Sequence, residues 1–172
     1  MGNSLKQFHF RKPGDKEGPE FFSLAKSCAE LDVNSLYFYL LFCRKFSETS
    51  VAVYAEDKLA GFLIAFPLPD QRETLFVWQI AISIEFRGMG LGKEMLNHLI
   101  ARDLPDPVKL LEVSITPSNL PSQKMFRRWA NEKKWECREE VFFSKELFNG
   151  ENHESETLFR IGPLSSPKKG NT

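Results

Sequence analysis

Cysteine is scarce in this chain. Three cysteines, Cys28, Cys43 and Cys137, occur among 172 residues, and their spacing fits neither a disulfide framework nor a metal clip. We therefore expect no metal site. We also expect three small buried thiols in a reducing, cytoplasmic compartment.

The chain also lacks long apolar runs and an excess of charge of one sign. No apolar stretch is long enough to span a membrane, and residues 1–6 lack the apolar centre of a secretory signal. Lys and Arg total 23, as do Asp and Glu, so the net charge is zero. Without a basic surface excess we expect no nucleic-acid partner, and we expect no membrane partner either.

The composition is that of a folded protein. Hydrophobic residues make up 42% of the chain, 16 of them phenylalanine, which is enough to build a core for a chain of this length. We predict one domain over residues 1–164. The polar stretch 165–172 is expected to be a disordered tail.

Hydrophobic periodicity and turn residues predict eleven elements. The predicted order is β-α-α-β-β-β-α-β-α-β-β. If the helix between them is a crossover, strands 75–82 and 110–115 run parallel. Asp32 or Asn34 is the expected cap of the second helix. The strands are predicted at 8–11, 50–55, 59–66, 75–82, 110–115, 135–143 and 157–161, and the helices at 19–29, 35–46, 93–102 and 121–133.

A glycine-rich segment, Arg87-Gly88-Met89-Gly90-Leu91-Gly92, joins the apolar strand 75–82 to the amphipathic run 93–100. Glycines let the backbone approach a ligand closely, and the amides at a helix N-terminus favour anions. A P-loop is excluded because Arg87 and Glu94 replace its first glycine and its Ser or Thr. A dinucleotide fingerprint is excluded because Lys93 replaces its third glycine.

The remaining pattern, Arg-x-x-Gly-x-Gly, is matched by Arg87, Gly90 and Gly92. This segment resembles the pyrophosphate loop of the GNAT family of acyl-CoA N-acyltransferases, and the predicted element order is that of the GNAT fold. The resemblance implies an α+β, αβα sandwich with a mixed central sheet and a splayed parallel pair of strands. The plainer interpretation is a helix start that happens to be rich in glycine.

The resemblance implies acetyl-CoA as co-substrate. Backbone groups of Ile80, Ala81 and Ile82 would bind pantetheine, and one amide there would hold the developing oxyanion. The diphosphate would lie against residues 87–92, namely Arg87, Gly88, Met89, Gly90, Leu91 and Gly92. Asn119 would be either a further CoA contact or a plain helix cap. Met125 and Phe126 occupy the place where many GNAT enzymes carry a tyrosine, so a tyrosine general acid is not expected there.

Longer segments resemble one branch of this family, the diaminobutyrate acetyltransferases of ectoine synthesis. They are Asp32-Val33-Asn34-Ser35-Leu36-Tyr37, Phe76-Val77-Trp78-Gln79, Thr116-Pro117-Ser118-Asn119 and the late stretch 153–164. The implied reaction transfers acetyl from acetyl-CoA to the 4-amino group of L-2,4-diaminobutyrate. A substrate with two ammonium groups and one carboxylate requires carboxylates and hydrogen-bond donors in its pocket.

The resemblance implies a substrate site made by Asp32, Tyr37, Trp78 and Glu156. Glu156, His153, Tyr37, or a water held by Glu112, are the candidates for removing the amine proton. Each has a plainer interpretation. Asp32 could only cap a helix, Tyr37 and Trp78 could be core aromatics, Glu156 and His153 could be surface residues, and Glu112 could pair with a cation.

Two other functions remain open at this stage. The chain could be a GNAT enzyme for another small amine, or a non-catalytic acyl-CoA-binding module. A homodimer is expected by analogy with the family alone.

Overall fold

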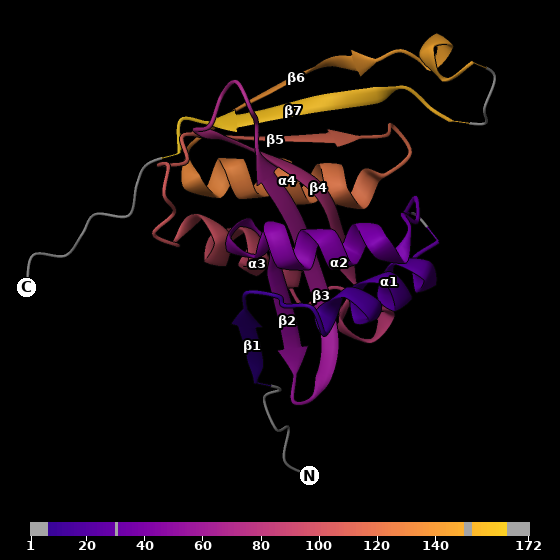
Figure 1. Ribbon diagram of the computed structural model, residues 1–172. Coiled ribbons are helices and arrows are strands. Elements are labelled where there is room, and N and C mark those ends of the chain that lie inside the picture. The colour runs from indigo at the N-terminus through magenta and orange to yellow at the C-terminus, as the bar shows by residue number, and fades with distance from the viewer. Residues whose placement is uncertain (1–6, 30, 150–152, 165–172) are drawn as a thin grey trace, which may run out of the picture. The chain divides into compact units, whose positions relative to one another are not determined.

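The computed structural model describes residues 7–29, 31–149 and 153–164. The predicted order of helices and strands is confirmed, and three short 3₁₀ helices are added to it (Figure 1). The predicted tail at 165–172 lies outside the described residues. The elements are β1 (Phe8–Arg11), α1 (Glu17–Ser27), α2 (Leu36–Lys45), η1 (Ser47–Thr49), β2 (Val51–Ala55), β3 (Lys58–Pro67), β4 (Thr74–Ile82), η2 (Ile84–Phe86), α3 (Leu91–Ile100), β5 (Leu110–Ile115), α4 (Leu120–Lys133), β6 (Glu136–Phe143), η3 (Lys145–Phe148) and β7 (Glu156–Gly162).

The chain divides into two compact units. The first unit comprises residues 1–65 and 79–102, and the second comprises residues 66–78 and 103–172. Strand β4 contributes its last four residues to the first unit and its first five to the second. The single domain over 1–164 stays a prediction.

The first unit is built around an antiparallel sheet. Strand β2 pairs with β1 on one side and with β3 on the other. All five residues of β2 are buried, because α1 and α2 pack on one face of this sheet and α3 packs against β2 (Figure 1). A strand covered on both faces is apolar at every position rather than at every second one, as residues 51–55 are.

Aromatic side chains fill the core of the first unit. Phe21 of α1 stacks on Phe62 of β3 with ring centroids 4.3 Å apart, and Tyr39 of α2 meets Phe62 edge-on at 6.0 Å. All three side chains are fully buried. Burying one such ring stabilises the fold by about 1.5–3 kcal/mol, so this cluster holds α1 and α2 on the sheet.

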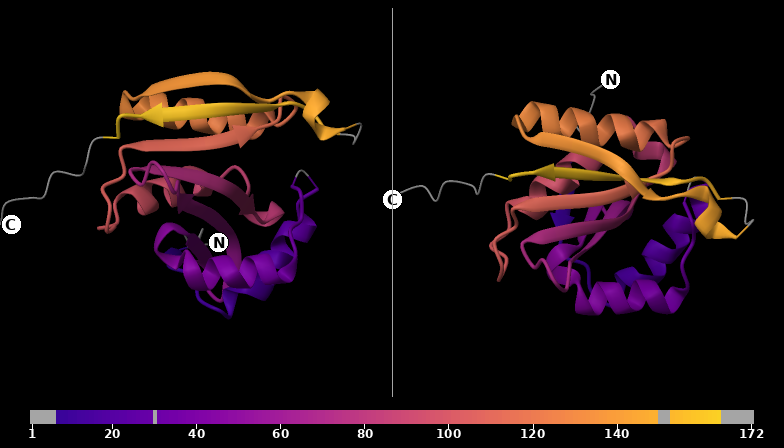
Figure 2. Two further views of the ribbon diagram at one scale, coloured as in Figure 1. Left: turned by 45° about the horizontal axis from the view of Figure 1, so that its top comes forward. Right: turned by 90° about the horizontal axis from the view of Figure 1, so that it is seen from above.

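The second unit contains a mixed sheet. Residues 74–77 of β4 pair in parallel with residues 110–113 of β5. Strand β7 is antiparallel to β5 on one side and to β6 on the other, and α4 lies along one face of this sheet (Figure 2). The predicted parallel pair is confirmed, and the predicted splay of its strands stays a prediction.

The start of α2 differs from the expectation. Ser35, and neither Asp32 nor Asn34, is the N-cap, and its Oγ accepts a hydrogen bond of 3.2 Å from the Phe38 amide. The predicted cap was wrong because a cap side chain reaches an amide three residues on, and the helix begins at Leu36. Asp32 and Asn34 therefore lie in the connection that leads to α2.

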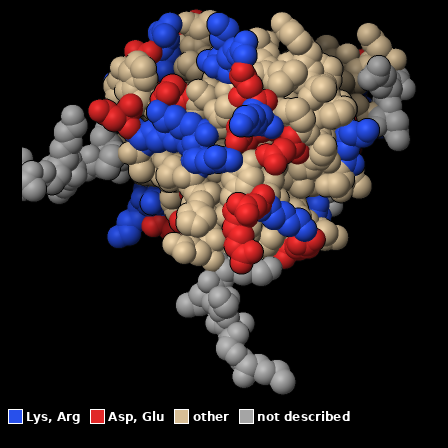
Figure 3. All heavy atoms as spheres, turned by 60° about the horizontal axis from the view of Figure 1, so that its bottom comes forward, with Lys and Arg blue, Asp and Glu red and all other residues tan. Residues whose placement is uncertain are grey.

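Charged side chains of both signs are interspersed on the surface. Figure 3 shows Lys and Arg beside Asp and Glu on the face that it presents, in keeping with the zero net charge. Among the described parts of the chain, no helix has the length and apolar character needed to cross a membrane.

Candidate functional site

The glycine-rich segment forms an open turn between β4 and α3. Gly88 and Gly90 have φ angles of 78° and 79°, in the left-handed region that favours glycine. Gly90 is the N-cap of α3, and apart from the adjacent residues no atom lies within 4 Å of where a Cβ would stand on either glycine. Outside the helices and strands of the described residues, no backbone carbonyl accepts from the amides of Gly88 or Gly90. These donors are suited to an anionic ligand.

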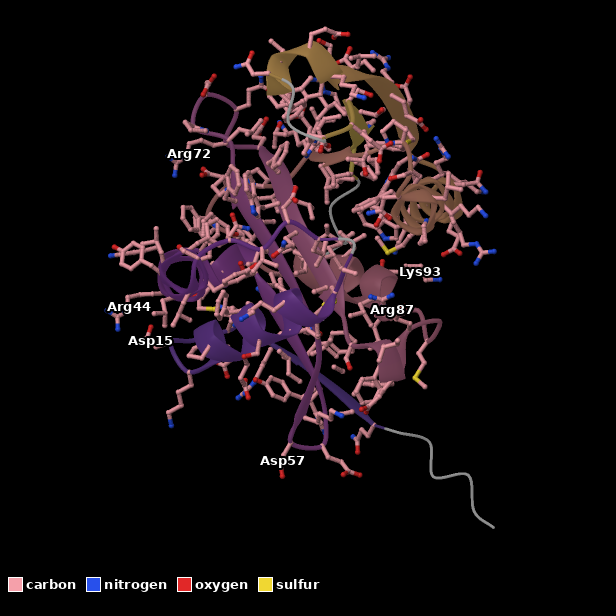
Figure 4. All side chains as sticks on the ribbon, turned by 90° about the vertical axis from the view of Figure 1, so that its right-hand side faces the viewer. Asp15, Arg44, Asp57, Arg72, Arg87 and Lys93 are labelled. Carbon is pink, nitrogen blue, oxygen red and sulfur yellow. The ribbon has the colours of Figure 1, made fainter. Side chains whose placement is uncertain are left out.

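Two cations border this turn. Arg87 precedes the glycines, and Lys93 stands in the first turn of α3; both lie at the beginning of that helix in Figure 4. The Arg87 Nε lies 3.4 Å from the Ile82 carbonyl oxygen, which ties its side chain to the end of β4. Helix dipole, amides and guanidinium together are suited to an anion such as a diphosphate.

Residues 80–82 lead directly into the turn. Ala81 is buried, whereas Ile80 and Ile82 are half-buried. The Ser83 amide donates to the Ala60 carbonyl at 2.9 Å, so the strand is held on the sheet up to the residue where the turn begins. The backbone predicted to bind pantetheine is therefore continuous with the loop predicted to bind diphosphate.

Asp32 and Tyr37 belong to the same unit as the loop. Tyr37 is 73% exposed on α2, so it is not a core aromatic. Asp32 is exposed in the connection before α2, and its carbonyl accepts a 3.0 Å hydrogen bond from Gln79 Nε2. The Gln79 Oε1 accepts from the buried Tyr39 hydroxyl at 2.9 Å. Within the first unit, the structure thus joins the Asp32 segment to the end of β4.

Glu112 of β5 is paired with a cation. Its carboxylate is almost fully buried and accepts a 2.7 Å hydrogen bond from Arg160 Nε, on the directly opposite position of β7. Arg160 Nη1 also lies 3.7 Å from Glu140 of β6. The plainer interpretation of Glu112, that it pairs with a cation, is confirmed. The proposal that Glu112 holds a water that removes the amine proton stays a prediction.

His153 and Glu156 lie together where β7 begins. The His153 Nδ1 is 2.7 Å from the Glu154 carbonyl oxygen, and the imidazole stacks on Phe148 with centroids 4.0 Å apart. A carbonyl only accepts, so Nδ1 carries the proton and a neutral ring has its lone pair on Nε2. That nitrogen lies 3.7 Å from a Glu156 carboxylate oxygen. The two residues form a half-buried pair at the start of β7.

Asn119 is a helix cap. Its Oδ1 accepts from the Ser122 amide at 3.2 Å at the start of α4, so the plainer of its two predicted roles is confirmed and a CoA contact stays a prediction. The preceding residue, Ser118, donates its hydroxyl and its amide to the Glu154 carboxylate. Further along α4, Phe126 is buried.

Trp78 is 47% exposed on β4. Its ring lies 6.4 Å from that of Phe66, centroid to centroid. A half-exposed indole beside a second aromatic ring provides a flat apolar wall with one N–H donor, as a small-molecule pocket requires.

Two of the three thiols are poorly suited to nucleophilic chemistry. Cys28 and Cys43 are buried and free, and Cys137 is half-buried. Burial raises the pKa of Cys43 to about 12 and also raises that of Cys137. A thiol with a raised pKa is a poor nucleophile at neutral pH.

Sequence reasoning missed the partners of the predicted residues. Gln79, Tyr39 and Arg160 were not singled out, although each contacts a predicted site residue or its backbone. The available signal was a polar residue inside an apolar strand, which is costly to bury unless it is hydrogen-bonded.

Comparison with known proteins gives consistent results. The model of the acetyltransferase (GNAT) family matches residues 18–130. The L-2,4-diaminobutyric acid acetyltransferase of Shouchella clausii is 41% identical over 155 residues, which cover 90% of this chain and 86% of that protein. The enzyme of the same name from Marinococcus halophilus is 39% identical over 94% of each chain.

A solved structure agrees with the sequence relatives. The diaminobutyrate acetyltransferase EctA from Paenibacillus lautus, in complex with L-2,4-diaminobutyric acid and coenzyme A, superposes with a TM-score of 0.89 and 34% identity. The match covers 94% of this chain and 98% of that one. The chain therefore belongs to the GNAT acetyltransferase family and, within it, to the L-2,4-diaminobutyric acid acetyltransferases.

Proposed function

We propose that this chain transfers the acetyl group of acetyl-CoA to the 4-amino group of L-2,4-diaminobutyrate, giving N4-acetyl-L-2,4-diaminobutyrate for ectoine synthesis. The observation that carries the proposal is the similarity to diaminobutyric acid acetyltransferases over about nine-tenths of the chain. The open glycine loop between β4 and α3 supports the use of a diphosphate-bearing acyl carrier.

The loop and β4 would bind acetyl-CoA. Amides of residues 88–92 and the Arg87 guanidinium would hold the diphosphate, and Asn119 would add a polar contact beside its capping bond. Backbone groups of residues 80–82 would bind the pantetheine arm, with one amide donating to the thioester carbonyl as negative charge develops on it. Acetyl-CoA supplies an activated acyl thioester, so the chain needs only to position and deprotonate the amine.

The diamine would be held by charge and by aromatic surface. The carboxylates of Asp32 and Glu156 are suited to its two ammonium groups. The exposed hydroxyl of Tyr37 offers a donor for its carboxylate, and Trp78 offers an apolar wall. Tyr37 also remains a candidate for accepting the amine proton.

Proton removal is the chemical requirement that the side chains must meet. An alkyl ammonium has a pKa near 10, so only about one molecule in a thousand is neutral at pH 7. His153 has its lone pair on Nε2, facing Glu156, which makes this pair the best-placed acceptor in the second unit. Glu112 is the weaker candidate, because a guanidinium already occupies one of its oxygens.

The departing thiolate needs no strong acid. A thiol has a pKa near 8.5, so CoA leaves readily and can take its proton from solvent. This explains how the chain can do without a tyrosine where α4 carries Met125 and buried Phe126.

We further propose a homodimer that forms through β6. This strand is at the end of the strand order in its sheet and is exposed along nearly its whole length. Val141 is 71% exposed, and Phe142, Phe143 and Leu147 are exposed beside it. An edge strand with apolar side chains favours pairing with a second copy.

The cysteines bear on the compartment in which the protein works. Three free cysteines support a reducing, cytoplasmic compartment.

The test is CoA release from acetyl-CoA with L-2,4-diaminobutyrate, and with ornithine, lysine and spermidine alongside, followed by NMR of the product. Fast turnover on diaminobutyrate with acetyl on the 4-amino nitrogen is the expected result. Turnover on another amine alone would support acetyl-CoA binding by the glycine-rich loop and contradict diaminobutyrate as the substrate. Tight acetyl-CoA binding without turnover on any of the four would favour a non-catalytic binding module.

A further inference from the structure

The side chain of Gln79 is buried inside an apolar strand. It is 7% exposed and stands between the exposed Trp78 and the half-buried Ile80. A buried amide that lacks partners is strongly destabilising, so both of its ends must be hydrogen-bonded. Oε1 accepts from the Tyr39 hydroxyl at 2.9 Å, and Nε2 donates to the Asp32 carbonyl at 3.0 Å.

The chemistry of the two neighbours requires an amide at this position. Burial raises the pKa of Tyr39, so its hydroxyl stays protonated and donates to Oε1. The Asp32 carbonyl can only accept, so it needs the N–H of the same side chain. Glutamate would offer two acceptors, and leucine would offer neither group. Glutamine meets both needs with one side chain.

The segment held in this way is irregular backbone. Residues 32–35 form no helix or strand between α1 and α2, and Asp32 and Val33 are exposed. The next anchor is Ser35, which caps α2. The Gln79–Tyr39 pair therefore fixes the backbone from Asp32 to the first turn of α2, where Tyr37 stands.

We propose that Gln79 is a positioning residue for the diamine, which acts by fixing the backbone of Asp32 and, through Tyr39, the start of α2. The inference rests on the proposed function, in which Asp32 and Tyr37 bind the substrate. It predicts that losing the Gln79 amide weakens capture of the diamine and leaves acetyl-CoA binding intact. The buried amide thereby links the two sequence segments that resemble the diaminobutyrate acetyltransferases.

The experiment compares Gln79→Leu, Gln79→Glu and Tyr39→Phe with the wild type. We expect KM for diaminobutyrate to rise about tenfold in Gln79→Leu, the size of effect that one or two buried hydrogen bonds produce. The Kd for acetyl-CoA should stay within about twofold of the wild type. Tyr39→Phe removes a single hydroxyl, so it keeps the test valid even if a Gln79 variant fails to fold. In the variant that combines Gln79→Leu with Tyr39→Phe, the loss of binding free energy for diaminobutyrate should be smaller than the sum of the losses in the two single variants.

A matched control comes from the same unit. Thr49 is 8% exposed, and its hydroxyl donates to the Ala65 carbonyl at 2.6 Å. Thr49→Val removes this buried bond without touching the Asp32 segment, so it should lower Tm and leave KM for the diamine unchanged. A rise in KM in this control equal to that in Gln79→Leu would show general loosening and overturn the inference.

Failure of the inference and failure of the proposed function give different results. A wild type that acetylates diaminobutyrate while Gln79→Leu and Tyr39→Phe keep its KM overturns the positioning role alone. A wild type that is inactive on diaminobutyrate and active on another amine overturns the proposed substrate, and the same comparison of KM then applies to that amine. A wild type that is inactive on every amine overturns both the proposed function and the positioning role of Gln79.

Discussion

Substituting Glu112 and Arg160 one at a time tests whether Glu112 is part of a structural ion pair or acts as a catalytic base. The two residues are direct cross-strand partners on β5 and β7, joined by a 2.7 Å bond. The Glu112 side chain is 7% exposed and the Arg160 side chain 42%. Arg160→Leu would leave a buried carboxylate without its cation, whereas Glu112→Gln keeps an acceptor for the Arg160 Nε.

The expected loss of stability in each variant follows from how far each side chain of the pair is exposed. Removing one partner of a fully buried pair costs about 3–5 kcal/mol, and water reaching the Arg160 side of this pair reduces that to about 2–3 kcal/mol. For a chain of this length the loss corresponds to a Tm lower by about 4–12 °C. Glu112→Gln should cost about 1 kcal/mol, because the hydrogen bond survives without the charge.

Thermal unfolding and steady-state kinetics on the same samples provide the assay. If Glu112 is structural, Glu112→Gln keeps kcat within about threefold of the wild type at temperatures well below its Tm, and Arg160→Leu is the less stable variant. A Glu112→Gln variant that retains its Tm but loses kcat by a hundredfold or more would refute the reasoning. It would place Glu112 in the proton transfer.

Three further predictions concern other parts of the chain. Glu156→Ala should raise KM for diaminobutyrate and leave the Kd for acetyl-CoA intact; unchanged kinetics would remove Glu156 from the substrate site. Gly90→Val should abolish acetyl-CoA binding measured by calorimetry, because a branched side chain at φ 79° strains the turn, whereas Gly14→Ala, which meets only ordinary contacts, should bind normally. The Arg127 guanidinium holds the pKa of Glu139 below its ordinary value through a two-point contact, so this pair stabilises the fold at pH 7 and less as the pH falls through the pKa of the paired carboxyl. Arg127→Met should therefore lower stability at pH 7 and by progressively less at lower pH; a deficit that does not shrink between pH 7 and pH 2 in urea titrations would contradict this.

The elements and the loop could be predicted because they depend on local pattern. Apolar alternation and glycine placement are properties of neighbouring residues, and the predicted order matches the observed one throughout. Gly88 and Gly90 adopt the positive φ angles that a close-approach turn requires. A phosphate site made of backbone amides is visible in a sequence, since the residues that shape the backbone are contiguous.

The partners of the functional side chains could not be predicted in the same way. Glu112 and Arg160 are 48 positions apart, and Gln79 is 47 positions from Asp32. Which residue lies opposite which depends on strand register, and a shift of one residue would turn every side chain to the other face. The prediction of the α2 cap was wrong for a local reason. Asp32, Asn34 and Ser35 are all residue types that cap helices well, so residue type alone does not decide that α2 begins at Leu36 with Ser35 as its cap.

The contacts of the second unit narrow the choice of base. Glu112 is bound by Arg160, and Glu154 accepts from Ser118, so each of these two carboxylates has a partner on the neighbouring elements. The Glu156 carboxylate stands opposite the Nε2 of His153, 3.7 Å away. Because the Glu154 carbonyl holds the proton on Nδ1, His153 acting as the base would take the amine proton on Nε2, and the Glu156 carboxylate would stabilise the imidazolium that forms. His153→Gln should therefore lower kcat more than Glu156→Gln does.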